Sequence, residues 1–160
     1  PDCNATCQSS SGLILDAYLQ DQDNDGITDT LDDDDNNDGI VDADIDGDGL
    51  IDITSLHRLD AMRYQLDGIG LRLTTDAGLD FSGCSIVIHQ GIAQRRCHGY
   101  ELVTDLDFDT NHNGVVDTND DYWNDGAGWL PIGDSARYFT ADFNGNGHVI
   151  RHLTINRPST

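Results

Sequence analysis

Aspartate and asparagine residues spaced two apart recur along the sequence, each set followed by a glycine and a hydrophobic residue. The repeated unit reads D-x-[DN]-x-D-G-hydrophobic-x-D and begins at Asp21, Asp34 and Asp44. Short carboxylate side chains at alternate positions can converge on one cation only if the backbone curls around it, and the glycine permits that curl. This spacing is that of a twelve-residue calcium loop, in which a backbone carbonyl at position 7 completes the oxygen ligands.

Each unit supplies a defined set of expected calcium ligands. The first loop offers the carbonyl of Ile27 and the side chains of Asp21, Asp23, Asp25, Asp29 and Asp32. The second offers the carbonyl of Ile40 and the side chains of Asp34, Asn36, Asp38 and Asp42. The third offers the carbonyl of Leu50 and the side chains of Asp44, Asp46, Asp48 and Asp52. Because the loops abut, we expect them to share carboxylates.

A fourth calcium loop is expected much later in the chain. It offers the carbonyl of Val115 and the side chains of Asp109, Asn111, Asn113, Asp117 and Asp120. Its two asparagines lower the ligand charge, so we expect weaker binding than at Asp21 and about four ions in all. A similar string begins at Asp142, but Ile150 at its ninth position cannot ligate through its side chain. We therefore interpret that string as a tight turn.

The acidity of the chain is concentrated in the first three loops. The 160 residues carry 30 acids against 8 bases, a net charge of −22, and residues 16–53 hold half of the acids and no base. Such a polyanion is repelled by phosphate backbones and anionic lipid, which excludes nucleic-acid and membrane-surface partners. Without metal these carboxylates would repel one another, so we expect calcium binding and folding to be linked. The alternative is a solvated, disordered acidic run.

Four cysteines indicate an oxidising compartment. Cys84 and Cys97 flank a strand-like run, so we expect them to pair, which leaves Cys3 and Cys7 for each other or for a neighbouring chain. Four buried free thiols are the alternative. The sequon at Asn4 is a possible glycosylation site, no apolar run reaches transmembrane length, and the start at Pro1 resembles a processed mature form. We expect a secreted or cell-surface protein.

The chain after residue 53 is expected to form a β-rich module. Leu56, Leu59, Met62 and Leu66 recur at helical spacing, which predicts one amphipathic helix over 55–67. Strands are expected within 85–89, 99–108, 136–143 and 148–155, separated by turn-forming residues. The expected organisation is an N-terminal segment 1–20, calcium loops over 21–53 and a module over 54–160. The fold class is α+β, mainly β, with a small sheet or a short solenoid.

Two resemblances cover most of the chain. The tandem D-x-D-x-D-G units over 21–53 resemble thrombospondin type-3 repeats of bacterial surface proteins, without the cysteines of the vertebrate repeats. The strings at 99–109, 129–133 and 139–156 resemble the GLUG-type β repeat of bacterial cell-surface proteins, a family that couples such repeats to acidic calcium loops. Family members stack several copies, whereas this chain has one. A single copy leaves its edges uncovered.

The N-terminal segment offers a strand that could cover such an edge. Its alternate apolar residues are Leu13, Leu15, Ala17 and Leu19. If this strand adds to the next molecule, the contact is head to tail and builds a filament; packing within its own molecule is the alternative. We therefore expect the repeating subunit of an extracellular bacterial fibre or surface assembly, a homopolymer.

The other function class is an adhesin or carbohydrate-binding module, with possible glycan partners. Tyr122, Trp123 and Trp129 would form a sugar-stacking platform or, alternatively, part of the core. Catalytic motifs such as G-x-S-x-G and H-E-x-x-H do not occur in the sequence, so we expect no enzymatic activity.

Overall fold

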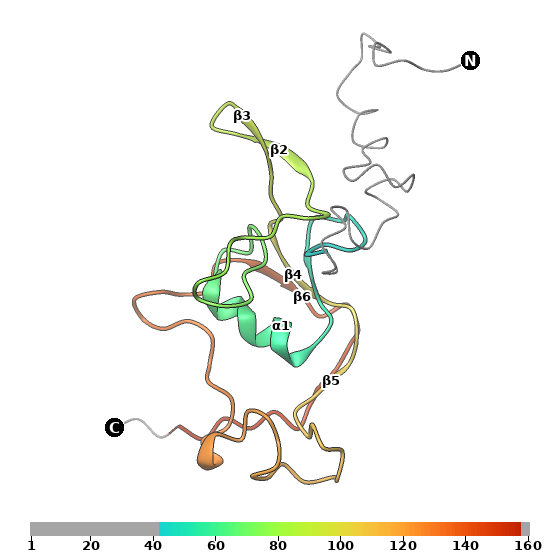
Figure 1. Cartoon of the computed structure of the whole chain (residues 1–160), viewed down its shortest axis with the longest axis vertical. Coiled ribbons are helices and arrows are strands. Elements are labelled where there is room, and N and C mark those ends of the chain that lie inside the picture. Colours follow the sequence, from blue (N-terminus) through green and yellow to red (C-terminus); the bar gives the residue numbers. More distant parts are fainter. Residues whose placement is uncertain (1–41, 158–160) are drawn as a thin grey trace, which may run out of the picture.

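The computed structural model describes residues 42–157 (Figure 1). Several sequence-based predictions fall outside this range. They are the loop beginning at Asp21, the loop beginning at Asp34 except for Asp42, the strand 12–19, Cys3, Cys7 and Asn4.

The described part of the chain consists mainly of short strands with one short α-helix, an α+β arrangement of small open sheets. In chain order the elements are β1 (Ile51–Ile53), α1 (Leu56–Ala61), the 3₁₀ helix η1 (Met62–Tyr64), β2 (Ile86–His89), β3 (Ile92–Arg95), β4 (Gly99–Leu102), β5 (Leu106–Asp107), the 3₁₀ helix η2 (Asn124–Gly126), β6 (Asp142–Asn144) and β7 (Ile150–Arg151). No helix within residues 42–157 has the length and apolar character needed to cross a membrane.

Parallel strands that are distant in sequence form the central sheet. Its order is β1-β4-β6, and both pairs run parallel, with Ile51 opposite Tyr100 and Tyr100 opposite Phe143. Further along the same chain segments, β5 pairs with β7, again in parallel. The segment containing β4 and β5 therefore lies beside the segment containing β6 and β7, as two successive rungs would in a solenoid.

The core lies on one face of β1 and β4. Ile51, Ile53, Tyr100 and Leu102 are buried together, because alternate residues of a strand point to the same face. Helix α1 packs its Leu59 against this cluster, and Figure 1 places the helix beside the sheet.

The helix is shorter than the sequence predicted. It ends at Ala61 and continues only as the 3₁₀ turn Met62–Tyr64, not to residue 67. The backbone leaves the helical region at Gln65, where φ is −146° and ψ is 80°. The Tyr100 hydroxyl donates to the carbonyl of Gln65 at 2.5 Å, and the Thr140 and Ala141 amides donate to the carbonyl of Leu66. The chain at Gln65 and Leu66 is therefore bonded to distant segments and does not continue as helix.

Two expected strands are also much shorter than predicted. Of residues 136–143 only 142–143 are in a strand, and of residues 148–155 only Ile150–Arg151. The Asp134 carboxylate accepts from the amides of Ala136 and Arg137, which curls the backbone where extension was expected. The expected strand 99–108 divides into β4 and β5 around residues 103–105.

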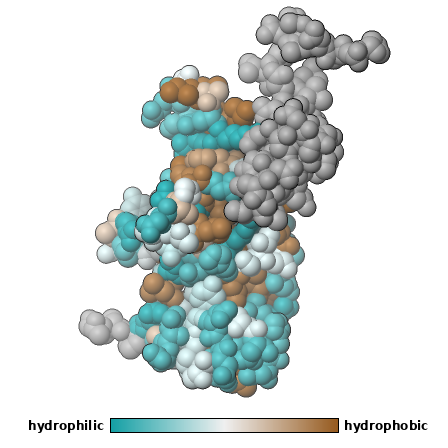
Figure 2. Space-filling view, viewed as in Figure 1, coloured by the Kyte–Doolittle hydropathy of each residue, from teal (hydrophilic) through white to brown (hydrophobic). Residues whose placement is uncertain are grey.

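An antiparallel hairpin, β2–β3, projects from the rest of the described chain (Figure 1). Gln90 and Gly91 both have positive φ, as a tight two-residue hairpin turn requires. Cys84 and Cys97 form a disulfide at the base of the hairpin, with a Cα–Cα distance of 5.0 Å. Near the tip, Ile88 and Ile92 are 69% and 67% exposed, and Figure 2 shows hydrophobic residues at this end of the molecule.

Candidate metal centres

The third predicted loop folds around its own carboxylates. The Asp44 carboxylate accepts from the amides of Gly49 at 2.8 Å and Gly47 at 2.9 Å. The Asp46 carboxylate accepts from the Asp48 amide at 3.2 Å. Carboxylate oxygens of Asp44, Asp46 and Asp48 lie within 4.8 Å of one another, close enough to contact a single metal ion.

The chain then returns toward the start of this loop. The Asp48 carboxylate accepts from the Leu50 amide at 2.8 Å, and the Asp52 carboxylate accepts from the Ile45 amide at 2.6 Å. Gly49 has a φ of +96°, a conformation that is costly for residues with a Cβ atom. The glycine of the motif is therefore needed for the turn that brings these side chains together.

Burial sets the electrostatics of this loop. Asp44 and Asp52 are buried, and burial raises the pKa of Asp44 to about 7, although the amides of Gly49 and Gly47 act in the opposite direction. Burial also raises the pKa of Asp52. Carboxylates removed from water in this way need a compensating positive charge to remain ionised at low cost.

One cationic side chain already lies beside the loop. Arg58, on α1 and buried, donates from Nη1 to the carbonyls of Asp42 and Asp52, both at 3.0 Å. Burial lowers the pKa of Arg58, while the nearby charges of Asp80, Asp52 and Asp42 raise it. This arginine fixes the two ends of the loop against the helix.

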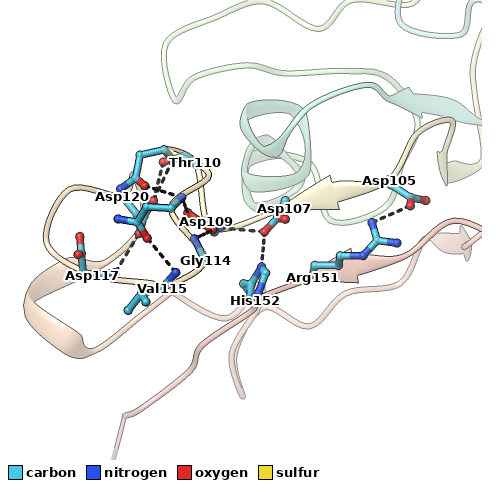
Figure 3. Close-up of polar contacts among 12 residues, drawn as sticks. Asp105, Asp107, Asp109, Thr110, Gly114, Val115, Asp117, Asp120, Arg151 and His152 are labelled. Carbon is cyan, nitrogen blue, oxygen red and sulfur yellow. Dashed lines mark hydrogen bonds and ion pairs between the residues drawn. The ribbon is translucent and has the colours of Figure 1, made fainter.

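The fourth predicted loop has the same internal pattern (Figure 3). The Asp109 carboxylate accepts from the amides of Gly114 at 2.7 Å and Asn113 at 3.1 Å. The Asn111 side chain accepts from the Asn113 amide at 3.0 Å, and the Asn113 side chain from the Val115 amide at 2.8 Å. Gly114 has a φ of +88°, the counterpart of Gly49.

Asp120 closes this loop. Its carboxylate accepts from the amides of Asn111 at 3.1 Å and Asp117 at 2.8 Å, and from the hydroxyl of Thr110 at 3.2 Å. The Asp117 amide donor is the largest cause of the lowered pKa of Asp120. The predicted end of the loop thus meets its beginning.

Exposed ion pairs hold the strand before this loop to β7. His152 contacts the Asp107 carboxylate at 2.7 Å, and Arg151 contacts Asp105 at 2.7 Å (Figure 3). Hydrogen bonding to Asp107 raises the pKa of His152, and the same bond lowers the pKa of Asp107. In Figure 1 the two loops lie toward opposite ends of the described chain.

The other residues that the sequence analysis singled out lie outside these two loops. Asp42 is buried, with its carbonyl bonded to Arg58, while most of its loop lies outside the described residues. Asp142 and Asn144 lie in β6, followed by a tight turn in which the His148 amide donates to the Gly145 carbonyl. Cys97 Sγ lies 3.7 Å from Asp44 Oδ2, but its sulfur belongs to the disulfide and is not a thiolate ligand.

Two of the three aromatic residues suggested as a sugar platform pack around the core. Phe108 is buried, and its ring contacts those of Tyr122 and Trp129, with centroid separations of 5.6 and 5.8 Å. Trp129 Nε1 donates to the Asp60 carboxylate at 2.7 Å. These contacts use the ring faces and the polar edge of Trp129 within the fold.

Two residues near the loop at Asp44 escaped the sequence reasoning. Arg58 belongs to the predicted helix, and no pattern in the sequence indicates that it contacts an acidic loop. Glu101 lies opposite Asp52 in the sheet and is buried, and burial raises its pKa. The one feature of the sequence that sets Glu101 apart is that it is the only glutamate.

Comparisons with known proteins found no similar protein. No family model, no curated protein and no solved structure matches the chain.

Proposed function

We propose that the chain is a calcium-stabilised, non-catalytic structural module that works outside the cell. One observation carries the proposal: the loops beginning at Asp44 and Asp109 repeat the same hydrogen bonds from backbone amides to side-chain oxygens. In both, the carboxylate at position 1 accepts from the glycine amide at position 6. In both, the side chain at position 5 accepts from the amide at position 7.

Calcium is the cation that best suits these donors. The expected ligands are oxygens of carboxylates, side-chain amides and a backbone carbonyl, the set that hard divalent cations prefer. Magnesium demands a tighter octahedron and usually retains several waters, whereas calcium accepts a flexible cage of protein oxygens. Extracellular calcium modules bind at about 10⁻⁴ to 10⁻³ M, which suits a protein whose Cys84–Cys97 disulfide is compatible with an oxidising environment.

The role of calcium would be cohesion. The loop at Asp44 buries carboxylates, those of Asp44 and Asp52, where a core would hold apolar side chains. A cation bound there stabilises the folded chain by an amount that grows with the logarithm of its free concentration above Kd, because the unfolded chain does not hold the ligands together.

We further propose that this module is the repeating subunit of a bacterial fibre or surface assembly, joined head to tail. Strand β6 is at the end of the sheet order β1-β4-β6 and is exposed along its length, with Phe143 43% exposed. An uncovered edge of this kind accepts an added strand through backbone hydrogen bonds. The predicted strand 12–19 of a second copy is the proposed occupant.

The adhesin alternative has less support. A sugar platform needs aromatic faces open to solvent, and Tyr122 and Trp129 use their rings to contact Phe108. We therefore keep the structural subunit as the leading proposal.

Thermal unfolding of the full chain tests the calcium proposal. We expect the Tm to rise with free calcium in the millimolar range, to rise much less with magnesium, and to fall in excess chelator. A Tm that excess chelator leaves unchanged would contradict calcium stabilisation.

Electron microscopy tests the assembly proposal. We expect fibres from the full chain in calcium and their loss after chelation. A chain beginning at Asp21 should fold, as judged by its calcium-dependent Tm, yet form no fibres. Fibres of normal length from that shortened chain would rule out strand addition by residues 12–19.

A further inference from the structure

The loop beginning at Asp44 lacks an acid at its twelfth position. That position is Ser55, whose side chain accepts from the Arg58 amide at 3.3 Å and caps the N-terminus of α1. The hydroxyl is therefore committed to the helix. In the loop beginning at Asp109, the same position is Asp120, which closes its own loop. Ser55 therefore supplies no carboxylate to the first of these loops.

Glu101 stands beside this loop on the neighbouring strand. In the parallel pairing of β1 with β4, Asp52 is opposite Glu101, while Ile51 is opposite Tyr100 and Ile53 opposite Leu102. Side chains of directly opposite residues stand on the same face of a sheet. Since the four flanking residues fill the core, Glu101 shares the other face with Asp52. Glu101 is only 2% exposed.

Asp52 has one carboxylate oxygen that lacks a hydrogen-bond partner among the described residues. Its Oδ2 accepts from the Ile45 amide, which holds the carboxylate inside the loop. Its Oδ1 is buried, as is the whole residue at 1% exposure, and it finds no hydrogen-bond donor in the part of the chain that the structure describes. A buried carboxylate oxygen without a donor is costly, and a cation is the partner that would satisfy it.

Asn144 fixes the orientation of Glu101 from the far side. It lies opposite Glu101 in the pairing of β4 with β6, and its Nδ2 donates to Glu101 Oε2 at 3.2 Å. Asp52, Glu101 and Asn144 thus form a row across the three strands of the sheet. Glu101 is the only glutamate in a chain whose other acids are all aspartate.

We propose that Glu101 is a ligand of the calcium ion held by the loop beginning at Asp44, and that Asn144 is its positioning residue. This inference rests on the proposed calcium binding of that loop. The ion joins β1 to β4, so the site is complete only when two segments far apart in the sequence have paired. Calcium then connects the loop beginning at Asp44 to β4 of the β-rich module.

The single glutamate makes a direct test possible in the unaltered chain. Glutamate labelled with ¹³C at its carboxyl carbon gives one NMR signal, from Glu101, while amide signals of Gly49 and Gly114 report on the two loops. We expect the Glu101 signal to move during a calcium titration with the same midpoint as Gly49. If Gly49 responds and Glu101 does not, the inference is overturned and the proposed function stands. If neither glycine responds, both are overturned.

Variants give a second readout. Glu101→Gln should raise the calcium concentration at the midpoint of the Gly49 titration about tenfold or more and leave the midpoint of Gly114 unchanged. Asp142→Asn, which removes a charge from the same sheet outside the row, is the matched control and should change neither response. Amide signals of Tyr100 and Leu102 check that β4 remains paired. If the two substitutions changed the Gly49 midpoint equally, Glu101 would act only through its negative charge, and the proposal would be overturned.

Discussion

The loops beginning at Asp44 and Asp109 have nearly the same local structure but very different surroundings. The first is enclosed by the helix, the disulfide and the sheet: Arg58 bonds its ends, Cys97 touches Asp44, and Glu101 lies opposite Asp52. The second closes on itself through Asp120 and is held by exposed ion pairs. The same motif therefore occurs in two settings. The first loop is tied to the helix and the sheet, whereas the second, although its end residues Asp109 and Asp120 are buried, is closed mainly by its own side chains.

This comparison teaches that loop geometry and loop stability have different origins. Hydrogen bonds between residues two to five apart define the curl of both loops. The loops differ in how much a substitution should lower the free energy of unfolding, because a change in an enclosed loop also disrupts the packing of the core. Four substitutions or substitution pairs test that difference.

The buried arginine should make the largest contribution. Arg58→Leu should lower the free energy of unfolding by about 3 kcal/mol, because the carbonyls of Asp42 and Asp52 lose their donors in a buried place. Arg137→Leu is the matched control; its side chain is 77% exposed and its ion pair with Asp134 spans 3.9 Å, so a change of under about 0.5 kcal/mol is expected. Urea denaturation in calcium measures both, and similar losses would contradict the buried role of Arg58.

Removing the disulfide should affect calcium binding by the loop at Asp44 and not by the loop at Asp109. Replacing Cys84 and Cys97 by serine should cost about 3 kcal/mol from loop closure alone. The calcium response of the Gly49 amide should also weaken, since Cys97 touches Asp44, whereas that of Gly114 should not change. If the calcium responses of both loops weakened equally, the disulfide would act on global stability only.

The two glycines at position 6 give a matched pair of substitutions. Gly114→Ala should cost about 1 kcal/mol for the positive φ, because a Cβ there meets nothing within 4 Å. Gly49→Ala should cost about 1 kcal/mol more, since its Cβ would approach His98 to 2.8 Å. Calorimetry of the two variants measures the difference. Equal costs would mean that His98 moves aside freely and that the first loop is no more tightly enclosed than the second.

The exposed pair beside the second loop should have the smallest effect. NMR titration should give His152 a pKa above its ordinary value, because Asp107 stabilises the protonated ring, and Asp107→Asn should return it toward that value. The pair contributes stability that is full below about pH 6.5 and is lost as pH rises through the higher folded-state pKa. A His152 titration unaffected by Asp107→Asn would contradict this contact.

Much of the loop structure could be predicted because it is local. The motif at Asp109 places its predicted ligands, its glycine and its closing Asp120 within twelve residues, and the structure brings them into one loop. The pairing of Cys84 with Cys97 was also expected from the strand-like run between them. In both cases the interacting residues are near neighbours in the chain.

The extent of the regular elements was less predictable. The pattern of Leu56, Leu59 and Met62 identified the helix but not its end, since Gln65 is non-helical and the carbonyls of Gln65 and Leu66 accept from the Tyr100 hydroxyl and the amides of residues 140–141. Alternating apolar residues likewise suggested one strand over 99–108, where the structure has two, each paired with a different later strand. Local patterns do not encode such distant partners.

The sequence by itself determined where the chain must curl, because an aspartate at position 1 and a glycine at position 6 form their hydrogen bond within one loop. Only the tertiary structure decided what surrounds each curl. Parallel pairing of β1 with β4 brings Glu101 opposite Asp52, and the packing of α1 brings Arg58 to the ends of the loop. The physical reason is that spacing along a chain specifies contacts between near neighbours, while contacts between distant segments arise only when the whole core assembles.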